Sequence, residues 1–274
     1  MSSTSKAAVL VLALLVPGIA AAQGQAADRA EVALPKTLRE AAPIDITGYW
    51  VAQGSEDWRY RWIVPEVGDL PGVPVSARGR EQADQWDPDA DEKAGLQCKG
   101  YGAPGLMRLP TRLHITWADD NTVKIETDAG QQTRLLTFGK PAPPASEKSL
   151  QGFSKAIWQT SGRIGAPAGG GRGGGRGRGE GAGPSRTAGQ LKVVTTNLRD
   201  GYLRKNGIPY SEHAVLTEYY TRAVSPTGEE WLVVTALVDD PTYLNEPFIT
   251  SSHFKKEADN AKWSPTTCNT REPR

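Results

Sequence analysis

The sequence predicts an all-β, mainly antiparallel fold, either a meander barrel or a barrel-like sandwich of about nine strands with one short helix. Three observations support this prediction. Short segments of alternating apolar and polar residues recur along the chain, turn-forming residues separate them, and amphipathic helical periodicity is nearly absent. A length of 274 residues with 38% hydrophobic residues is enough for a substantial core.

The first 22 residues have the pattern of a secretory signal. Lys6 precedes the apolar run 7–16, Pro17 and Gly18 break that run, and three alanines then permit cleavage near Ala22. The run is too short to cross a bilayer as a helix, although an uncleaved anchor is the alternative. We therefore expect a periplasmic or secreted protein with no membrane span.

Charge and cysteine content exclude several classes of function. The chain has 32 Lys and Arg against 31 Asp and Glu, and removal of the signal with Lys6 leaves 31 against 31. Near-neutrality argues against a nucleic-acid partner. Cys98 and Cys268, the only cysteines, are expected to form a disulfide after export, because two cysteines are too few for an all-cysteine zinc site. Cys98 as a nucleophile is the less favoured reading.

The chain is expected to form one domain over residues 44–268. A mobile leader, 23–43, precedes it, and a tail, 269–274, follows it. Residues 45–53 begin the first strand, and the alternation of Trp and Tyr with Arg predicts a second strand over 58–64.

Residues 76–86 read as the short helix, with Ser76 as its N-cap. Residues 87–110 are rich in Gly and Pro and are expected to be irregular.

A meander follows, in which the turn 128–131 sets the register. If Ala129 and Gly130 form the loop, Ile125 faces Arg134 and Val123 faces Leu136. Asn206 and Gly207 give a second hairpin signal. The strands expected from here to the end of the domain are 112–117, 123–127, 131–138, 154–163, 190–198, 213–224, 229–238 and 248–256.

Residues 165–189 hold twelve of the thirty glycines and four arginines. Such a segment buries too little apolar surface to offset its ordering entropy, so we predict a disordered loop insertion. Weak binding of a polyanion is the alternative.

Two stretches resemble known families. Gly48 and Trp50 resemble the G-x-W opening strand of lipocalin-like barrels, which implies that Trp50 closes one barrel end beneath a basic side chain, Lys255 or Lys256. Most of residues 45–268 resembles a family of uncharacterised exported bacterial proteins. The stretches that carry this second resemblance are 97–110, 191–198, 201–211, 217–220 and 239–243. It implies a secreted β-rich fold and carries over no activity.

Candidate ligand contacts come from strand faces and from one loop. Arg112 and His114 share a polar strand face that either meets water or lines a polar lumen, and Arg134 is either an inward ligand anchor or part of a structural ion pair. The loop 201–211 combines aromatic and cationic groups, including Lys205, that could bind a ligand or simply form a rigid turn. The ligand-binding candidates are Arg112, His114, Arg134, Tyr202, Arg204, Tyr210 and Glu218.

Nothing in the sequence marks a catalytic residue, a cofactor or a metal site. The histidines, His114, His213 and His253, lack metal-ligand spacing, and no nucleophile elbow or phosphate-binding loop is present. Glu212 and His213 are neighbours, so in a strand they would point apart and could not act as a pair.

The sequence therefore favours an exported, non-enzymatic barrel that binds a small, partly apolar molecule. Its aromatic lining would come from Trp50, Trp58, Trp62, Trp117 and Tyr220. The alternatives are an envelope enzyme with His114 or His213 as base and Glu218 as partner, and an interaction module of an envelope complex.

Overall fold

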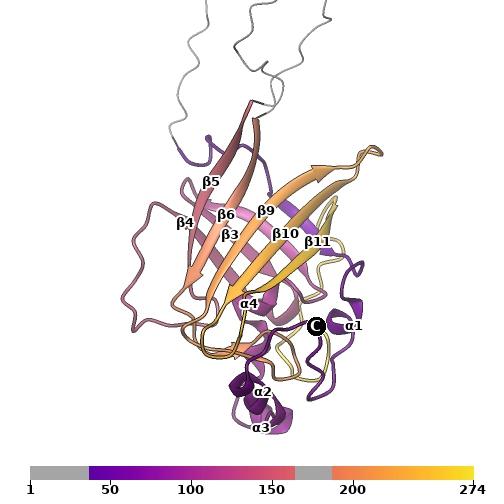
Figure 1. Cartoon of the computed structure of the whole chain (residues 1–274). Helices are drawn as coiled ribbons and strands as arrows, with labels where there is room; N and C mark the ends of the chain where they lie inside the picture. Colours follow the sequence, from indigo (N-terminus) through magenta and orange to yellow (C-terminus); the bar gives the residue numbers. More distant parts are fainter. Residues whose placement is uncertain (1–36, 164–186) are drawn as a thin grey trace, which may run out of the picture. The chain divides into compact units, whose positions relative to one another are not determined.

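The computed structural model describes residues 37–163 and 187–274. Nine strands close a barrel in the order β1-β11-β10-β9-β6-β5-β4-β3-β2, which confirms the predicted fold class (Figure 1). The barrel strands are β1 (Gly48–Ala52), β2 (Arg112–Asp119), β3 (Thr122–Thr127), β4 (Thr133–Phe138), β5 (Phe153–Arg163), β6 (Thr187–Thr196), β9 (Val215–Val224), β10 (Glu230–Asp239) and β11 (Phe248–Glu257).

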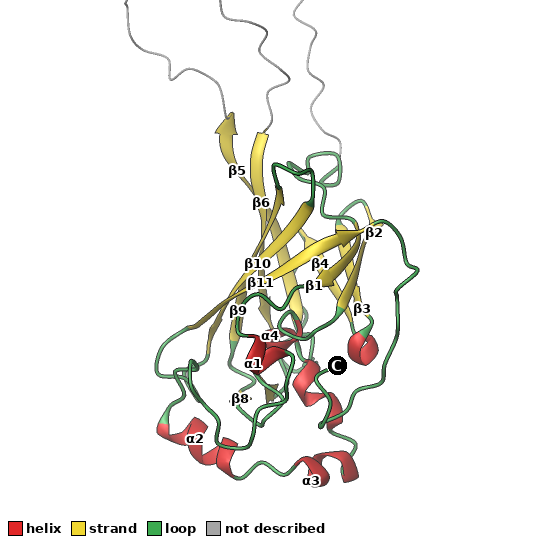
Figure 2. Ribbon diagram, turned by 90° about the vertical axis from the view of Figure 1, so that its right-hand side faces the viewer, coloured by secondary structure: helices red, strands yellow, loops and turns green. Residues whose placement is uncertain are grey.

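Short helices and a small hairpin gather at one end of the barrel, which we call the capped end (Figures 1 and 2). The hairpin pairs β7 (Gly201–Tyr202) with β8 (Pro209–Tyr210). The helical segments are α1 (Trp58–Arg61), α2 (Ala77–Asp84), α3 (Pro88–Lys93), η1 (Gln97–Tyr101), α4 (Ala103–Leu106) and η2 (Ala129–Gln131), the last lying in the β3–β4 turn.

The strand pairing follows the predicted meander with one exception. Ile125 pairs with Arg134 and Val123 with Leu136, as the turn predicted, and Gly130 has a φ of +68° that favours glycine. All barrel pairs are antiparallel except β4 with β5, which are parallel. The loop 139–152 that joins these two strands makes the parallel pairing possible.

The strand predicted over 58–64 is wrong, because Trp58–Arg61 form helix α1. Alternation suggested that the aromatic side chains point inward, whereas Trp58 is 58% exposed and Arg61 is buried. Arg61 donates from Nε to the carbonyl of Arg108, so a buried polar contact, absent from the local pattern, selects the conformation.

Helical content at the capped end exceeds the single helix expected. That helix is confirmed as α2, where the Ser76 hydroxyl accepts from the amide of Gly79. Residues 87–110, expected to be irregular, contain α3, η1 and α4. Asp87 caps α3 and Pro88 occupies its first turn, so local capping chemistry stabilises a helix within a sequence rich in turn formers.

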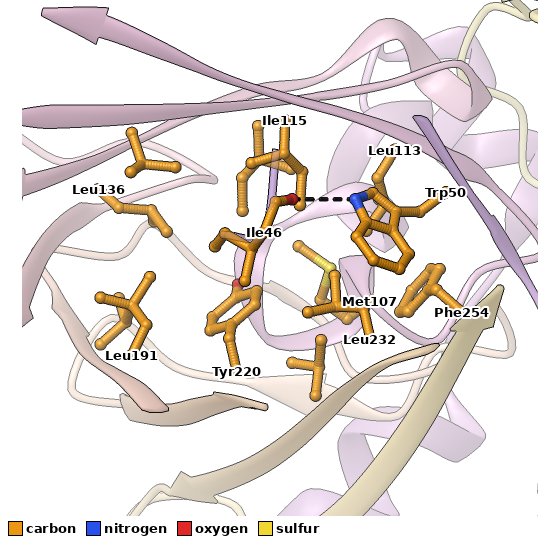
Figure 3. Close-up of a cluster of buried hydrophobic side chains, with 14 of the residues drawn as sticks. Ile46, Trp50, Met107, Leu113, Ile115, Leu136, Leu191, Tyr220, Leu232 and Phe254 are labelled. Atoms are coloured by element: carbon orange, nitrogen blue, oxygen red, sulfur yellow. Dashed lines mark hydrogen bonds between the residues drawn. The ribbon is translucent and has the colours of Figure 1, made fainter. Parts of the chain in front are cut away.

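A packed apolar cluster fills the centre of the barrel (Figure 3). Trp50 is fully buried in it, and its indole Nε1 donates to the carbonyl of Ile46 at 2.9 Å. The ammonium of Lys256 lies 5.4 Å from the centroid of the Trp50 ring. Tyr220 belongs to the same cluster, so the barrel centre is a core rather than an open lumen at these residues.

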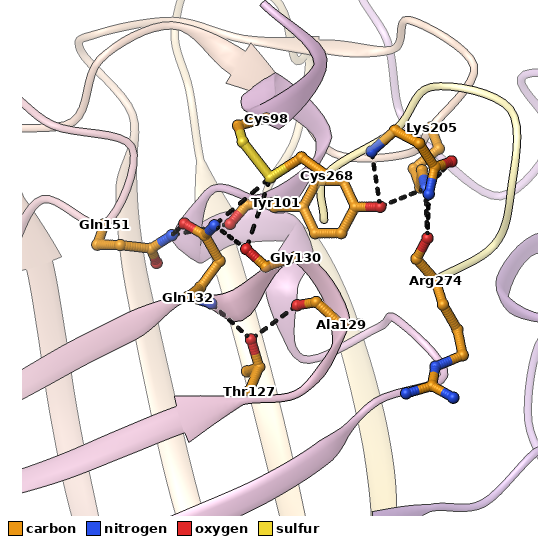
Figure 4. Close-up of a disulfide and its surroundings, with 11 residues drawn as sticks. Cys98, Tyr101, Thr127, Ala129, Gly130, Gln132, Gln151, Lys205, Cys268 and Arg274 are labelled. Atoms are coloured by element: carbon orange, nitrogen blue, oxygen red, sulfur yellow. Dashed lines mark hydrogen bonds between the residues drawn. A yellow bond between two sulfur atoms is a disulfide. The ribbon is translucent and has the colours of Figure 1, made fainter. Parts of the chain in front are cut away.

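A second apolar cluster joins the cap to the barrel. The hairpin residues Leu203 and Ile208 pack there with Leu216 of β9 and Phe248 of β11. The predicted disulfide is confirmed at the same end, where Cys98 and Cys268 lie with their Cα atoms 5.1 Å apart (Figure 4). The bridge attaches the C-terminal segment to η1, which carries Cys98.

Several expectations fall on residues outside the described ranges. These are the signal 1–22, the leader as far as residue 36, and loop residues 164–186. Residues 187–189, expected to lie in the loop, instead belong to β6. Where the chain is described, none of the helices combines the length and apolar character needed to cross a membrane.

Candidate functional site

Four cationic side chains line a small cavity at the capped end, which we call the arginine cavity. It has a volume of about 20 Å³ and lies between α1, the η1–α4 segment, the turn of the β7–β8 hairpin and the C-terminal segment. The cations are Arg61, Arg108, Arg204 and Lys205. A space of this size holds one or two water-sized groups.

Arg61 is held rigidly by α1 and its surroundings. Its side chain is fully buried, Nη1 donates to the carbonyl of Gln53 at 3.1 Å, and the guanidinium pairs with Glu56. Nη2 has no hydrogen-bond partner among residues 37–163 and 187–274. One donor of a buried charged group therefore remains unused.

Arg108 leaves two nitrogens unused. Its side chain is 5% exposed, Nη2 donates to Asp57 Oδ2 at 3.0 Å, and the guanidinium carbon lies 5.6 Å from the centre of the Phe248 ring. Within the described part of the chain, Nε and Nη1 have no partner. Because buried donors are nearly always satisfied, these two atoms call for a ligand or for water.

Arg204 comes from the turn of the β7–β8 hairpin. Its guanidinium carbon lies 4.0 Å from the centroid of the Tyr60 ring, and Nη1 donates to the carbonyl of Pro71 at 2.8 Å. Nε is again buried without a partner in the residues described. The ring and the carbonyl fix the guanidinium, so its free donor is preorganised.

The hairpin that carries Arg204 is itself fixed by its turn. Asn206 donates from Nδ2 to the carbonyls of Glu66 and Asp69, at 2.9 and 3.0 Å. Gly207 has a φ of +83°, and a Cβ there would come within 2.4 Å of Trp86, so only glycine fits. The Asn-Gly signal seen in the sequence thus positions a cation of the cavity.

Lys205 lies beside Arg204 and binds the C-terminal segment (Figure 4). Its Nζ donates to the Tyr101 hydroxyl at 2.8 Å and to the carbonyl of Glu272. Burial lowers the pKa of Lys205 to about 7 and raises the pKa of Tyr101 to about 12. Lys205 is therefore a cation of the cavity whose charge changes near neutral pH.

Positive charge exceeds negative charge around the cavity. Three guanidinium groups line it, whereas two carboxylates, Glu56 and Asp57, pair with them. Burial lowers the pKa of Arg61 to about 10, against a raising effect of Glu56, and burial followed by the charge of Arg108 lowers the pKa of Arg204 to about 10. Arg61 and Arg204 therefore remain charged at neutral pH, and this environment favours an added negative charge.

The ligand-binding residues predicted from the sequence fall into three separate places. Arg204 lines the cavity, and Tyr202 and Tyr210 lie in the same hairpin. The Tyr202 hydroxyl donates to Asp91 at 2.7 Å, and burial raises the pKa of both tyrosines. Their rings are buried, so they form part of the cap.

Arg112 and His114 lie on the outer face of β2, opposite the buried Leu113 and Ile115. Arg112 donates from Nε to Glu257 at 2.9 Å. His114 stacks on Tyr49 with 4.2 Å between ring centroids and contacts Glu126 at 3.2 Å. These residues are therefore outside the barrel and away from its core.

Arg134 and Glu218 form an ion pair inside the barrel. The shorter of their two contacts is 2.6 Å, and both side chains are 1% exposed. Tyr220, Ser154 and Thr195 contact the same guanidinium. Both terminal nitrogens of Arg134 have protein partners, as expected of a structural ion pair, and only its Nε has none in the described residues.

The residues predicted to act together in the alternative hypothesis, an envelope enzyme, do not lie close together. His114 is on the outer face, Glu218 is inside the barrel, and His213 is exposed. The expectation that Glu212 and His213 point apart is wrong, because His213 Nε2 lies 3.8 Å from Glu212 Oε1. Both residues precede β9 and occupy a turn, where strand alternation does not apply. The described residues contain no group of three or more metal-ligating side chains.

Sequence reasoning missed Arg61 and Arg108. Arg61 was assigned to the polar face of a strand, and Arg108 to an irregular segment. They are 47 positions apart, and no local pattern signals that they meet. Only the basic and aromatic composition of the loop 201–211 pointed to this end of the molecule.

Comparison of the chain with protein-family models, curated proteins and solved structures found no match.

Proposed function

We propose that this protein is an exported, non-enzymatic barrel that binds a small monoanion, such as a carboxylate, in the arginine cavity. The observation that carries this proposal is the group of buried guanidinium nitrogens, on Arg61, Arg108 and Arg204, that have no partner in the described chain. A buried charged donor without an acceptor is costly, and an anion that accepts from these nitrogens removes the cost.

Charge and size favour a monoanion over a larger anion. Arg61 and Arg108 pair with Glu56 and Asp57, whereas Arg204 has no ion pair in the described residues, so one guanidinium charge is left for a ligand, and Lys205 adds a second positive charge when it is protonated. A volume of about 20 Å³ suits the polar end of a carboxylate. Arginine donors, fixed in direction, bind such oxygens more specifically than lysine does.

Export is supported by two independent features. The first 22 residues have the pattern of a secretory signal, and Cys98 and Cys268 form a disulfide. Disulfides persist mainly in oxidising compartments. A periplasmic or secreted ligand carrier is consistent with both features and with the absence of an assembled catalytic group among the described histidines.

Binding is tested by thermal unfolding of the purified protein in increasing sodium acetate. A ligand at about 100 times its dissociation constant adds about 2.7 kcal/mol to the free energy of unfolding, so the melting temperature should rise saturably by several degrees. Arg108→Gln should abolish the saturable rise. Arg59→Gln is the matched control, because Arg59 is 62% exposed, pairs with Asp69 and lies outside the cavity.

The outcomes are distinct. A saturable rise in wild type and Arg59→Gln but not in Arg108→Gln supports the proposal. An equal, unsaturated rise in all three proteins is a general salt effect, and would show that water alone satisfies the cavity.

A further inference from the structure

A second, larger cavity adjoins the arginine cavity, and we call it the Trp62 cleft. Its volume is about 390 Å³, within the range of small-molecule sites. The C-terminal segment forms one wall, through Glu272, Pro273 and Arg274. The remaining lining residues are Val51, Ala52, Trp62, Pro110, Thr111 and Arg112.

The two cavities are close enough for one ligand to occupy both. Pro273 lines each of them. The guanidinium carbon of Arg61, on the arginine cavity, lies 4.9 Å from the centroid of the Trp62 ring, on the cleft. Leu109 and its neighbour Pro110 line one cavity each. A group bound to Arg61 is therefore within a few bond lengths of the cleft.

The electrostatic character of the two cavities differs. Arg112 pairs with Glu257 at 2.9 Å, and Arg274 pairs with Asp128 at 2.7 Å, so the cleft's cations already have anionic partners. Valine, alanine, tryptophan and proline supply its apolar walls, and Thr111 and Glu272 complete the lining. The cleft thus suits a neutral, apolar group, whereas the arginine cavity suits a negative one.

We propose that the ligand is a carboxylic acid with a compact aromatic or other apolar body. The carboxylate occupies the arginine cavity, and the body contacts Trp62 and Pro110 in the adjoining cleft. This inference rests on the proposed function and specifies its ligand class. It also assigns Trp62 as the residue that selects among carboxylates, because its indole is the largest apolar surface of the cleft.

The inference is tested by calorimetric titration of the full-length protein with acetate, benzoate and benzamide. Benzoate should bind at least ten times more tightly than acetate, because the ring leaves water for the cleft. Benzamide, which has the same ring without the charge, should bind at least a hundred times more weakly than benzoate.

Two variants separate the contribution of the ligand's apolar body to affinity from that of its carboxylate. Trp62→Leu keeps an apolar residue against the barrel core but shortens the cleft wall, and should lower benzoate affinity by a much larger factor than acetate affinity. Trp58→Leu is the matched control, since Trp58 is 58% exposed and lines neither cavity. Wild-type affinities should persist in that control.

The possible failures are distinguishable. Equal affinity for acetate and benzoate would overturn the inference and leave the anion site intact. Tight benzoate binding that is insensitive to Trp62→Leu would overturn the placement of the ring. If neither anion binds to the wild-type protein, both the inference and the proposed function are wrong.

Discussion

Buried arginines at two places in this protein differ in the partners that surround their guanidinium groups. Inside the barrel, Arg134 pairs with one carboxylate, Glu218, and contacts three hydroxyl groups, and within the described residues only its Nε lacks a partner. At the capped end, Arg61 and Arg108 leave three buried nitrogens without a partner in the described residues.

The direction of the pKa shift distinguishes Arg134, a structural charge, from Arg61, a charge that we assign to ligand binding. Burial lowers the pKa of Arg134, but Glu218 and Tyr220 raise it by more, so its pKa is raised overall. For Arg61, burial prevails over Glu56, and its pKa is lowered to about 10. Arg61 and Arg108 also line a cavity, whereas Arg134 lines neither the arginine cavity nor the Trp62 cleft, so the free nitrogens of Arg61 and Arg108 are the ones placed to meet a ligand.

The comparison predicts that removing a charge has very different effects at the two places. Arg134→Met should lower the free energy of unfolding by about 3–5 kcal/mol, because it leaves Glu218 buried and unpaired. Arg108→Gln should cost less than about 1 kcal/mol without ligand, because it relieves excess positive charge and leaves Asp57, which is 50% exposed, in water. Urea unfolding monitored by circular dichroism measures both values.

A double variant is the control for Arg134. Arg134→Met with Glu218→Leu should recover much of the lost stability, since no buried charge remains. Equal costs for the Arg134 and Arg108 single variants would remove the distinction between the two sites.

The disulfide is expected to affect both stability and the arginine cavity. It joins residues 170 positions apart and holds the segment that contributes Pro273 to the cavity wall. Cys98→Ser with Cys268→Ser should cost about 2–5 kcal/mol and weaken acetate binding. Unchanged acetate affinity in the folded variant would show that the wall forms without the bridge.

Lys205 should make stability depend on pH. Its pKa in the folded protein, about 7, lies below the ordinary value of 10.5, so the unfolded chain binds more protons between these values. Stability should therefore rise with pH across this window, by up to about 3 kcal/mol between pH 7 and 10. The measurement compares the free energy of unfolding of the wild type with that of Lys205→Met at several pH values. A difference between the two proteins that stays constant with pH would contradict the burial of a charged lysine.

Parts of the fold were predictable because their determinants are local. The β3–β4 register follows from alternation and one glycine, Gly130, and the cap of α2 follows from Ser76. The 58–64 segment was misassigned, because alternation shows a period without showing which face is buried. The conformation of this segment depends on a hydrogen bond from Arg61 to the carbonyl of Arg108, which is distant in the sequence.

The candidate site was predictable only in its hairpin. Loop 201–211 was conspicuous for its cations around an Asn-Gly turn, and it supplies Arg204 and Lys205 to the cavity. The other half of the site comes from segments in which arginine usually indicates solvent exposure. Burial of those arginines is a tertiary property, and no spacing rule reports it.

The most direct test is a crystal structure of the protein in sodium bromide, with anomalous diffraction to locate the ions. Bromide is a monoanion that accepts from guanidinium nitrogens, and we expect an anomalous peak within hydrogen-bond distance of Arg61, Arg108 and Arg204, but none beside Arg134. A cavity that holds only water while bromide occupies other surfaces would contradict the assignment of these arginines to an anion.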